Sequence, residues 1–396
     1  MKKKILHLGA GGLMIANIKS LKEAGFEVYV LDKNPDAPGF HYSDKFAAID
    51  IVDKNEVLDY ALEQKIDAVL AVNDAGVNTA AFVCEKMGLI FHSLEVAINC
   101  TDKGYMRDCW RTKGLSQPDY IIINGSSEIY EKAINFGFPC VLKPCLNWGS
   151  KGVSIVKDKK DLNKAIDFVE KNDRNDRFII ERFINGTEVT VEGLVQNGSV
   201  GILACSDKEH QDHSMFRIAM ALNYPARLTQ IQENILRDLI VKAVGALGIV
   251  NGAFHAECLI SGEDVFLVEM GGRPGGGHIF GYIVEVVSGI NMPINLAKIL
   301  LGLNAEIYPK CQKGSCYKFF SSPPGVFRAV FNLEEARKSV GILDLGFNMK
   351  QGSIVGPISN DADRPGYIVA SGEDRNAAIA NANNAFQKIK FRVDDN

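Results

Sequence analysis

The N-terminal part of the chain alternates between strand-length apolar runs and helical patterns. The predicted strands are residues 4–8, 27–31, 46–49 and 68–72, and the predicted helices are residues 13–24, 54–64 and 76–87. Strands that alternate with helices in this way are typical of a parallel, doubly wound sheet with helices on its faces. We therefore expect a Rossmann-like α/β domain at the start of the chain.

A glycine-rich turn follows the first strand, and an acidic residue ends the second. Residues 9–12 have the sequence Gly-Ala-Gly-Gly, and together with Asp32 they suggest a dinucleotide site. Met14 replaces the third glycine of that pattern, so a Rossmann-like scaffold is favoured and an NAD-dependent oxidoreductase stays an alternative. Asn73 and Asp74 follow the fourth strand, at the edge where such sheets bind ligands, although starting a helix is their more ordinary role.

A second region combines a lysine with a loop of small residues. The predicted strand at 139–144 contains Lys143, residues 145–152 form a glycine-containing loop, and strand character resumes at 153–156. This is not the Walker arrangement, in which the loop leads into a helix. Small residues still let backbone N–H groups approach phosphate oxygens, and Lys143 adds a point charge. The sequence predicts a phosphate-binding loop, with an ordinary flexible hairpin as the alternative.

Two apolar runs at residues 254–260 and 265–268 flank a short polar turn and predict a β-hairpin. If the loop is residues 262–264, Glu257 lies directly opposite Glu269, with Cβ atoms roughly 5 Å apart. Facing carboxylates repel each other unless a cation lies between them. Mg²⁺ commonly bridges one or two carboxylates and a substrate phosphate. The hairpin therefore predicts a divalent metal site, and two solvated acids are the alternative.

Arg273 follows the hairpin in a glycine-rich turn, where its planar fork can hold a carboxylate or a phosphate. Residues 275–277 are all glycine and would leave room for a substrate side chain. His278 comes next and could contact that side chain, or it could simply begin a helix. We therefore predict a substrate site around Arg273.

The remaining segments carry weaker signals. The polar stretch 207–215 contains His210 and His213, which suggests a mobile loop more than a metal site, because no third ligand is evident. From about residue 308 onward, strand-like runs alternate with turns, and residues 373–389 form an amphipathic closing helix. These features predict a small α+β unit at the C-terminal end.

Taken in order, these charged residues resemble the ATP-grasp superfamily over essentially the full length of the chain. The resemblance implies a mixed α/β and α+β fold with three parts. They are a Rossmann-like domain at 1–95, an ATP-grasp domain of two α+β halves at 96–305 and a small α+β cap at 306–396. The smaller, lid-forming half of the ATP-grasp domain would span about residues 115–180.

The resemblance also implies a role for each of several residues. Lys103 and Lys143 would bind phosphate, and the loop with Asn147, Gly149, Ser150 and Gly152 would close over the triphosphate. Glu181 and Phe183 belong to the hinge that contacts adenine, and Glu188 would bind the ribose. Glu257 and Glu269 would hold Mg²⁺, or Mn²⁺, and Arg273 would hold the carboxylate substrate and its acyl phosphate, with Lys143 and Arg273 as the catalytic pair. These expectations concern Lys103, Lys143, Asn147, Gly149, Ser150, Gly152, Glu181, Phe183, Glu188, Glu257, Glu269 and Arg273.

One position departs from the common pattern of that superfamily. Many members have an asparagine as a further metal ligand two residues after the second glutamate, and Gly271 stands there. The spacing from Glu269 to Arg273 looks more like the ligases that join two amino acids into a dipeptide. Residues 364–372 also look like the cap of that branch and of related ligases of purine synthesis.

The function implied by the resemblance is ATP-dependent ligation of a carboxylate to an amine through an acyl phosphate. The cofactors would be ATP and Mg²⁺, and the substrates would be amino acids or similar small molecules. A purine-pathway ligase or formate-dependent transformylase is the alternative within the superfamily. An NAD-dependent oxidoreductase or a nucleotide-binding protein without turnover is the alternative from another class.

Composition sets limits on partners and location. Of 396 residues, 46% are hydrophobic and 23% are charged, and the net charge of −4 gives no reason to expect a nucleic-acid or membrane partner. The nine cysteines are scattered and contain no Cys-x-x-Cys pair, which suggests reduced thiols in a cytoplasmic protein. Relatives in the superfamily are often dimers, so a homodimer is a possible assembly.

Overall fold

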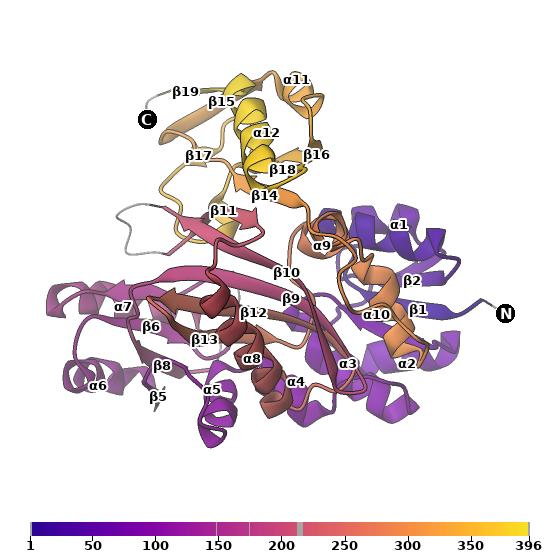
Figure 1. Ribbon diagram of the computed structural model, residues 1–396, viewed down its shortest axis with the longest axis horizontal. Helices are drawn as coiled ribbons and strands as arrows, with labels where there is room; N and C mark the ends of the chain where they lie inside the picture. The colour runs from indigo at the N-terminus through magenta and orange to yellow at the C-terminus, as the bar shows by residue number, and fades with distance from the viewer. Residues whose placement is uncertain (1, 148, 174, 212–216, 395–396) are drawn as a thin grey trace.

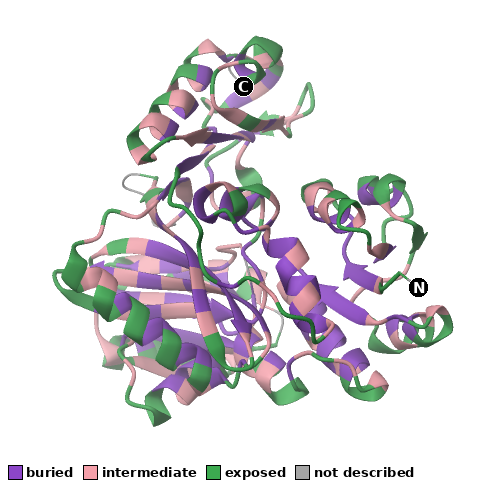
Figure 2. Cartoon of the chain, turned by 45° about the vertical axis from the view of Figure 1, so that its right-hand side comes forward, coloured by how far each residue is buried: buried purple, intermediate pink, exposed green. Residues whose placement is uncertain are grey.

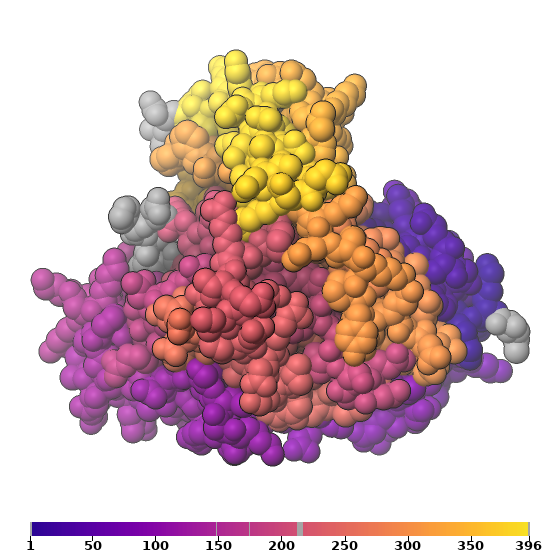
Figure 3. All heavy atoms as spheres, in the orientation of Figure 1, coloured from indigo at the N-terminus to yellow at the C-terminus, as the bar shows by residue number. Residues whose placement is uncertain are grey.

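The computed structural model describes residues 2–147, 149–173, 175–211 and 217–394, and these residues form four sheets. Figure 1 shows the N-terminal sheet at the right, a small sheet with its helices at the left, a large sheet between them and a C-terminal unit that projects upward. The space-filling view shows the same projection, with the C-terminal residues rising above a broad body (Figure 3). The predicted mixed α/β and α+β fold is confirmed.

The N-terminal sheet has the order β3-β2-β1-β4, and every pair in it is parallel. Its strands are β1 (Lys4–Leu8), β2 (Glu27–Leu31), β3 (Lys45–Ala47) and β4 (Ala68–Ala71). Its helices are η1 (Gly12–Met14), α1 (Ile15–Glu23), η2 (Pro38–Tyr42), α2 (Lys54–Gln64), α3 (Asp74–Met87) and α4 (Leu94–Thr101). Strand residues such as Leu6, Leu8 and Val69 are fully buried because helices cover both faces. The expectation of a parallel, doubly wound sheet is confirmed.

A smaller sheet has the order β5-β8-β6-β7 and is antiparallel throughout. Its strands are β5 (Tyr120–Asn124), β6 (Cys140–Pro144), β7 (Ser154–Val156) and β8 (Arg177–Arg182). The accompanying helices are α5 (Lys103–Thr112), η3 (Ser126–Glu128), α6 (Ile129–Phe136) and α7 (Lys159–Asn172). Helices α6 and α7 pack an apolar core against one face of this sheet. The other face contributes to the cavity described below.

The largest sheet has eight antiparallel strands in the order β13-β12-β9-β10-β11-β14-β18-β16. Its strands are β9 (Thr187–Gln196), β10 (Ser199–His210), β11 (Ala219–Tyr224), β12 (Gly252–Ser261), β13 (Asp264–Gly271), β14 (Gly314–Phe319), β16 (Ile342–Phe347) and β18 (Gly366–Gly372). The helices beside it are α8 (Gln230–Leu247), the π-helical turn η4 (Ile279–Ile283), α9 (Val284–Ser288) and α10 (Met292–Leu300). Helix α8 covers one face through a buried apolar cluster that includes Leu236, Ile240 and Phe254. Figure 2 shows that buried residues concentrate in the strands, whereas the outer helices have exposed faces.

The C-terminal unit is continuous with this large sheet. Strand β14 pairs with β11, so β14, β18 and β16 extend the sheet that begins with β13. The remaining elements are β15 (Gly325–Phe331), α11 (Leu333–Arg337), β17 (Ile354–Val355), η5 (Asp361–Asp363), α12 (Arg375–Lys388) and β19 (Lys390–Asp394). The predicted unit at 306–396 therefore shares backbone hydrogen bonds with the preceding residues. The division of the chain into three domains at the predicted boundaries stays a prediction.

One local expectation was wrong. The polar stretch 207–215 was expected to be a loop, but residues 207–210 belong to β10, which runs to His210. Residues 279–283 form a π-helical turn that leads into α9. His213 lies outside the described residues.

Among the described residues, no single helix is long and apolar enough to cross a membrane. One pair of helical segments, residues 279–288 and 292–300, has the required length and composition only when the two are taken together. The pair is bent by 106°.

Candidate functional site

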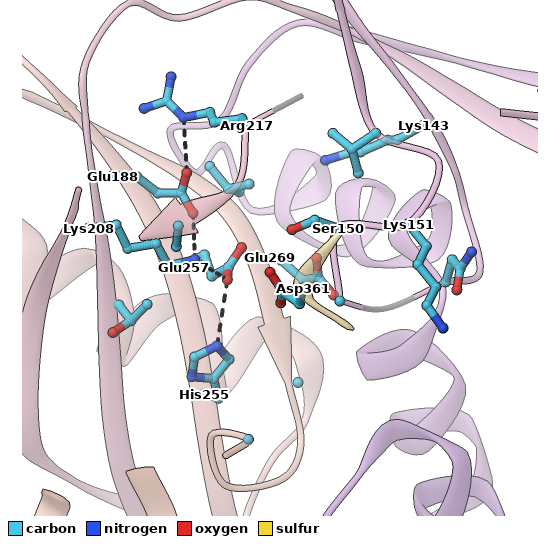
Figure 4. A pocket seen from close by; sticks show the side chains of 18 of the residues that line it. Lys143, Ser150, Lys151, Glu188, Lys208, Arg217, His255, Glu257, Glu269 and Asp361 are labelled. Carbon is cyan, nitrogen blue, oxygen red and sulfur yellow. Dashed lines mark hydrogen bonds and ion pairs between the residues drawn. The ribbon is translucent and has the colours of Figure 1, made fainter. Parts of the chain in front are cut away.

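A cavity of about 460 Å³ lies between the large sheet and the small sheet. The large sheet forms its floor, the small sheet and the loop after β6 form its roof, and residues of the N-terminal sheet and of η5 reach its margins (Figure 4). Most of the predicted site residues line it, namely Lys103, Lys143, Asn147, Gly149, Ser150, Glu181, Phe183, Glu188, Glu257, Glu269 and Arg273. Gly152 and His278 are the two predicted residues that do not line this cavity.

Strand register explains the polar floor of the cavity. Side chains two apart on a strand share a face, and directly paired residues on neighbouring strands also share it. Two rows of paired residues cross β12, β9 and β10, and they are Glu257–Thr190–Ser206 and His255–Glu192–Ala204. A third row starts with Leu259 and Glu188. Glu188, Thr190 and Glu192 thus face the cavity side of one central strand.

Glu188 is the most heavily paired residue of the floor. Its carboxylate accepts hydrogen bonds from Lys208 Nζ at 2.6 Å, His210 Nε2 at 3.0 Å and Arg217 Nε at 3.1 Å. Burial alone would raise the pKa of Glu188, but Lys208 and His210 outweigh it and lower that pKa to about 2. Glu188 is therefore ionised at any physiological pH.

The two predicted metal ligands lie directly opposite each other, as expected, but through a different turn. The register pairs Glu257 with Glu269. The expected three-residue loop was wrong, because β12 ends at Ser261 and β13 begins at Asp264, which leaves two residues in the turn. A bulge next to Glu257 shifts the register by one residue and restores the predicted pair.

Each of these carboxylates contacts a lysine. Lys208 Nζ lies 2.5 Å from Glu257 Oε1, and Lys103 Nζ lies 3.2 Å from Glu269 Oε1. The two side chains retain 24% and 26% exposure, so both remain open to the cavity. Within the described ranges, no group of three or more His, Cys, Asp or Glu side chains could hold a metal ion. A pair of carboxylates is nevertheless the donor set that Mg²⁺ uses when phosphates and water complete its shell.

The roof contains a buried triad of charges. Glu181 on β8 accepts hydrogen bonds from Arg107 Nη2 at 2.6 Å and Lys143 Nζ at 2.8 Å. Arg107 Nη1 also donates to Leu267 O at 2.6 Å, which links α5 to β13. Each of the three side chains is at most 5% exposed. Burial would raise the pKa of Glu181, but the charges of Arg107 and Lys143 keep it below its usual value. The Glu181 side chain therefore holds Lys143 in place at the cavity wall.

The loop after β6 connects the roof to η5. Asn147 Nδ2 donates to Asn172 O at 2.6 Å, and Lys103 Nζ donates to Asn147 O at 2.7 Å. Gly149 O accepts a hydrogen bond from Asp361 N at 3.5 Å. Gly149 and Gly152 have φ angles of +68° and +78°, which favour glycine. Trp148 lies outside the described residues.

Arg273 lies at the margin formed by the N-terminal sheet. Its Nε and Nη2 atoms donate to the two carboxylate oxygens of Asp74 at 2.9 and 2.6 Å. Asp74 is the first residue of α3, and Asn73 is the N-cap that accepts a hydrogen bond from Gly76 N. Burial would raise the pKa of Asp74, but the charge of Arg273 lowers it overall. Apolar side chains lie nearby in one packed cluster, and those that line the cavity are Met14, Val72, Ala219, Leu222, Ile279, Tyr317 and Phe319.

The expectation for His278 was wrong in its placement. The residue is 4% exposed, and its ring lies 4.5 Å between centroids from the tilted ring of Tyr367, with Tyr282 and Tyr317 also in contact. Burial lowers the pKa of His278, with Asp344 opposing that shift. Since the adjacent chain bends around glycines, the backbone at Gly276 and Gly277 lines the cavity while the histidine side chain packs behind Tyr317. His278 is therefore part of the wall support and does not face the cavity.

Comparison with known proteins identifies the fold and two of its parts. Residues 136–281 match the family described as ATP-grasp domain, and residues 318–394 match the L-amino acid ligase C-terminal domain 2. The chain carries an ATP-grasp domain. The ATP-grasp match covers the loop at 145–152, the segment 181–184 and the hairpin that carries Glu257 and Glu269, and so it includes most of the cavity lining.

Individual relatives extend over the whole chain. The chain is similar to a formate-dependent phosphoribosylglycinamide formyltransferase of Prochlorococcus marinus (strain MIT 9312), with 26% identity over 98% of this chain and 97% of the relative. Among solved structures it is similar to an L-amino acid ligase from Bacillus licheniformis, with a TM-score of 0.86, 21% identity and coverage of 100% and 99%. A phosphoribosylglycinamide synthetase from Anaerococcus prevotii has a TM-score of 0.77, 20% identity and full coverage of both chains.

The ATP-grasp assignment confirms the broad functional prediction. The ATP-grasp domain at residues 136–281 bears out the prediction of an enzyme that uses ATP and Mg²⁺. The cavity fits these cofactors, because it combines two facing carboxylates with three cationic side chains, Lys103, Lys143 and Lys208. The roles of the individual residues stay predictions.

The cavity lining and the side chains packed behind it also include charged groups that the sequence did not single out. Lys208 and Arg217 bind Glu188, Arg107 binds Glu181, and Glu192 accepts a hydrogen bond from His255 at 2.5 Å. Burial would lower the pKa of His255, but Glu192 and then Glu257 raise it to about 9. One available signal was the spacing of Arg107 four residues after Lys103, on the same face of a helix.

The glycine-rich turn of the N-terminal sheet, for which the sequence suggested a dinucleotide site, lies beside this cavity. Asp32 Oδ2 accepts a hydrogen bond from Ala10 N at 2.8 Å, so its carboxylate is engaged by the turn itself. Met14, in the same turn, lines the ATP-grasp cavity. The turn therefore contributes an apolar wall to a cavity that is centred on other elements.

Proposed function

We propose that this protein joins the carboxylate of one amino acid to the amine of another and cleaves ATP to ADP and phosphate. The observation that carries this proposal is the Arg273–Asp74 pair beside the apolar end of the cavity. An amino acid presents a carboxylate and an ammonium group on one carbon, and the pair offers a guanidinium and a carboxylate, each of which could exchange its present partner for one of these groups. The neighbouring apolar side chains would accept its side chain.

The order of groups along the cavity supports the same proposal. Val141, Ile155 and Leu259 would enclose the adenine near the hinge at 181–184, and Glu188 would lie at the ribose. Lys103 and Lys143 would contact the phosphates. Arg273 lies at the far end, where the γ-phosphate would meet the carboxylate substrate.

In the first step the substrate carboxylate would attack the γ-phosphorus, and the bond to the β-phosphate oxygen would break to give an acyl phosphate and ADP. Glu257 and Glu269 would hold Mg²⁺, which would neutralise charge on the transferred group. Lys143, fixed by Glu181, and Arg273 would add positive charge around the same oxygens. These groups act by position and electrostatics, which suits a reaction with little covalent chemistry for the protein to perform.

In the second step the amine would attack the acyl carbon, phosphate would leave and an amide would form. Water must be excluded at this stage, because it would hydrolyse the acyl phosphate. The loop at 149–152 and the η5 segment, already joined between Gly149 and Asp361, would cover the phosphate end. Gly276 lines the cavity, and a Cβ added there would meet nothing within 4 Å, so this position leaves room for substrate.

A second candidate is formate-dependent formylation of a phosphoribosyl amine. The full-length similarity to the Prochlorococcus enzyme favours it, and the acyl-phosphate chemistry would be the same with formate as the carboxylate. Such a substrate needs cations for its phosphate. At the apolar end Arg273 is held by Asp74, Arg364 donates to Asp361 O and Ala219 O, and the charged His255 is held by Glu192. The match to an L-amino acid ligase C-terminal domain favours the first candidate.

The test is Mg²⁺-dependent phosphate release from ATP with pairs of amino acids, followed by mass spectrometry of the products. The proposal predicts ADP together with a new mass equal to two amino acids minus one water. No release with any amino-acid pair, combined with release when formate and glycinamide ribonucleotide are supplied, would replace it with the second candidate.

A further inference from the structure

Lys208 occupies a position that no part of the proposed reaction yet uses. Its Nζ atom lies 2.6 Å from Glu188 Oε1 and 2.5 Å from Glu257 Oε1, and its side chain is 11% exposed. The two acids have different proposed partners, since Glu188 would contact the ribose and Glu257 would contact the metal. Lys208 therefore connects the two ends of the nucleotide site (Figure 4).

Strand register places this lysine there. Asp207 on β10 pairs with Val189 on β9, so the next residue, Lys208, lies beside Glu188. Glu257 pairs with Thr190, two residues along β9, and it is therefore a diagonal neighbour that a long side chain can reach. The bridge is a consequence of three adjacent strands in one register.

The strand that carries Lys208 is also anchored from its opposite face. Asp207 accepts two hydrogen bonds from the Arg375 guanidinium, one of them from Nη2 at 2.7 Å, and another from Arg227 N at 3.1 Å. Arg375 is the first residue of α12 in the C-terminal unit. The backbone beneath Lys208 is thus held while its side chain spans the cavity floor.

Lys208 differs from the other lysine that contacts a predicted metal ligand. Lys103 makes one ion pair, to Glu269 at 3.2 Å, and donates to the carbonyl of Asn147 in the phosphate loop. It can exchange Glu269 for a phosphate oxygen. Lys208 has two carboxylates at hydrogen-bond distance, and a phosphate would have to displace both.

We propose that Lys208 is a positioning residue that couples Mg²⁺ binding to nucleotide binding. By holding Glu257 Oε1, Lys208 would leave Oε2 to bind the metal; by holding Glu188, it would fix the acid that is proposed to contact the ribose. A carboxylate ligand held by such a contact binds metal more tightly, and loss of the contact typically costs about 10- to 100-fold in affinity. This role rests on the proposed function, because it requires Mg²⁺ and nucleotide to occupy this cavity.

Other charged side chains lie near Glu188 and Glu257, and they are the groups that could take over the contacts of Lys208. Glu188 also contacts His210 and Arg217, and Glu257 has His255 Nε2 at 3.7 Å. Each of these three side chains reaches only one of the two acids. Removing Lys208 therefore removes the connection between the two acids, while each acid keeps another cationic neighbour. We expect the loss to weaken the coupling between Mg²⁺ binding and nucleotide binding more than it disturbs the charge balance of either acid.

The experiment measures ADP binding by calorimetry at a series of Mg²⁺ concentrations for the wild type, Lys208→Met, Lys208→Gln and Lys208→Arg. Lys242→Met is the control, because Lys242 is an exposed lysine paired with Asp238 on α8. We expect the Mg²⁺ concentration for half-maximal ADP binding to rise about 10- to 100-fold in the Met and Gln variants. The Arg variant should recover at least part of the effect, and Lys242→Met should match the wild type.

A purely structural lysine gives a different result. In that case the melting temperature of Lys208→Met and Lys208→Gln would fall while the Mg²⁺ requirement for ADP stayed at the wild-type value, and the proposal would be overturned. Failure of the Met variant to fold leaves the Gln variant to decide. If the wild type itself bound ADP without any dependence on Mg²⁺, both the proposed function and this inference would fail. A change in melting temperature alone, described above, would overturn only the inference, so the two failures are distinguishable.

Discussion

Two buried histidines show how differently the N-terminal sheet and the cavity floor are built. His7 on β1 is fully buried, donates one hydrogen bond from Nδ1 to Gly9 O, and has a pKa lowered to about 4 by burial. His255 on β12 has a side chain 14% exposed. Burial would lower its pKa too, but Glu192 and Glu257 raise it to about 9. One histidine is neutral and the other is charged at pH 7.

The difference follows from what surrounds each strand. Helices cover both faces of the N-terminal sheet with apolar side chains, so a buried polar group finds few partners there. The floor of the cavity has an apolar face toward α8 and a polar face of acids and bases paired across strands. Changes in the first region should cost stability, and changes in the second should cost function.

The largest expected effect is on the floor. Glu269→Gln should lower turnover by roughly 10³-fold or to below detection, because a proposed metal ligand loses its charge. The melting temperature should change little, since Glu269 is a quarter exposed. Steady-state phosphate release and thermal unfolding measure the two quantities.

Glu263→Gln is the matched control for this prediction. Glu263 lies in the two-residue turn of the same hairpin and is exposed. It should keep wild-type activity. Full activity in Glu269→Gln would contradict the assignment of Glu269 as a metal ligand. It would also contradict the claim that changes in the cavity floor cost function whereas changes in the N-terminal sheet cost stability.

The roof triad sharpens the comparison, because it is charged yet as deeply buried as the N-terminal sheet. Arg107→Met should destabilise the protein by about 3–5 kcal/mol, since Glu181 would keep only Lys143 and Leu267 O would lose its donor. Arg111→Met on the same helix, 66% exposed, should change stability by less than about 0.5 kcal/mol. Equal shifts of the urea midpoint in the two variants would contradict the claim that burial makes the loss of Arg107 costly to stability.

The two histidines predict opposite pH dependences of stability. An unfolded histidine has a pKa of about 6.5. His7 has a lowered pKa, so its contribution to the free energy of unfolding is present above pH 6.5 and is lost as the pH falls toward 4. This contribution is on the order of 3 kcal/mol. His255 has a raised pKa, so its contribution is complete below pH 6.5 and is lost as the pH rises through 9.

Melting temperatures at pH 4 to 9 test this for the wild type, His7→Gln and His255→Gln. The first variant should flatten the acid side of the profile and the second should flatten the alkaline side. A variant that shifted the whole profile without changing its slope on the named side would contradict the assignment for that histidine.

The smallest effect is expected at a glycine of the cavity wall. A Cβ at Gly276 would meet nothing within 4 Å, so Gly276→Ala should change stability by less than about 0.5 kcal/mol. A Cβ at the preceding Gly275 would lie 2.7 Å from both carboxylate oxygens of Glu192, so Gly275→Ala should cost about 1–3 kcal/mol. Chemical denaturation of the two variants compares them directly, and a larger loss for Gly276→Ala would reverse the described packing.

The same comparison explains what the sequence could predict. The strands β1 and β2 and the helix α2 have the predicted bounds, because apolar periodicity and capping act locally. The facing pair Glu257 and Glu269 was also predicted, although a bulge that no local pattern announces was needed to produce it. These features depend on residues close together in the chain.

The rest of the floor could not be found in this way. Lys208 lies in a strand that is polar on both faces: Asp207 binds Arg375 on one side, and Lys208 binds two acids on the other. Such a segment has no apolar alternation and resembles a loop in sequence. The pair Asp74 and Arg273 is 199 residues apart, and only the packing of the N-terminal sheet against the ATP-grasp residues brings it together.

The most direct test of the central claim is to trap the activated carboxylate. The protein would be incubated with MgATP, hydroxylamine and single amino acids or formate, and hydroxamate and nucleotide products would be measured together. The account predicts hydroxamate of one amino acid or a small set, in equal amount to ADP, and neither product in Glu269→Gln. Formation of AMP and pyrophosphate, or release of ADP with no hydroxamate from any of these carboxylates, would contradict it.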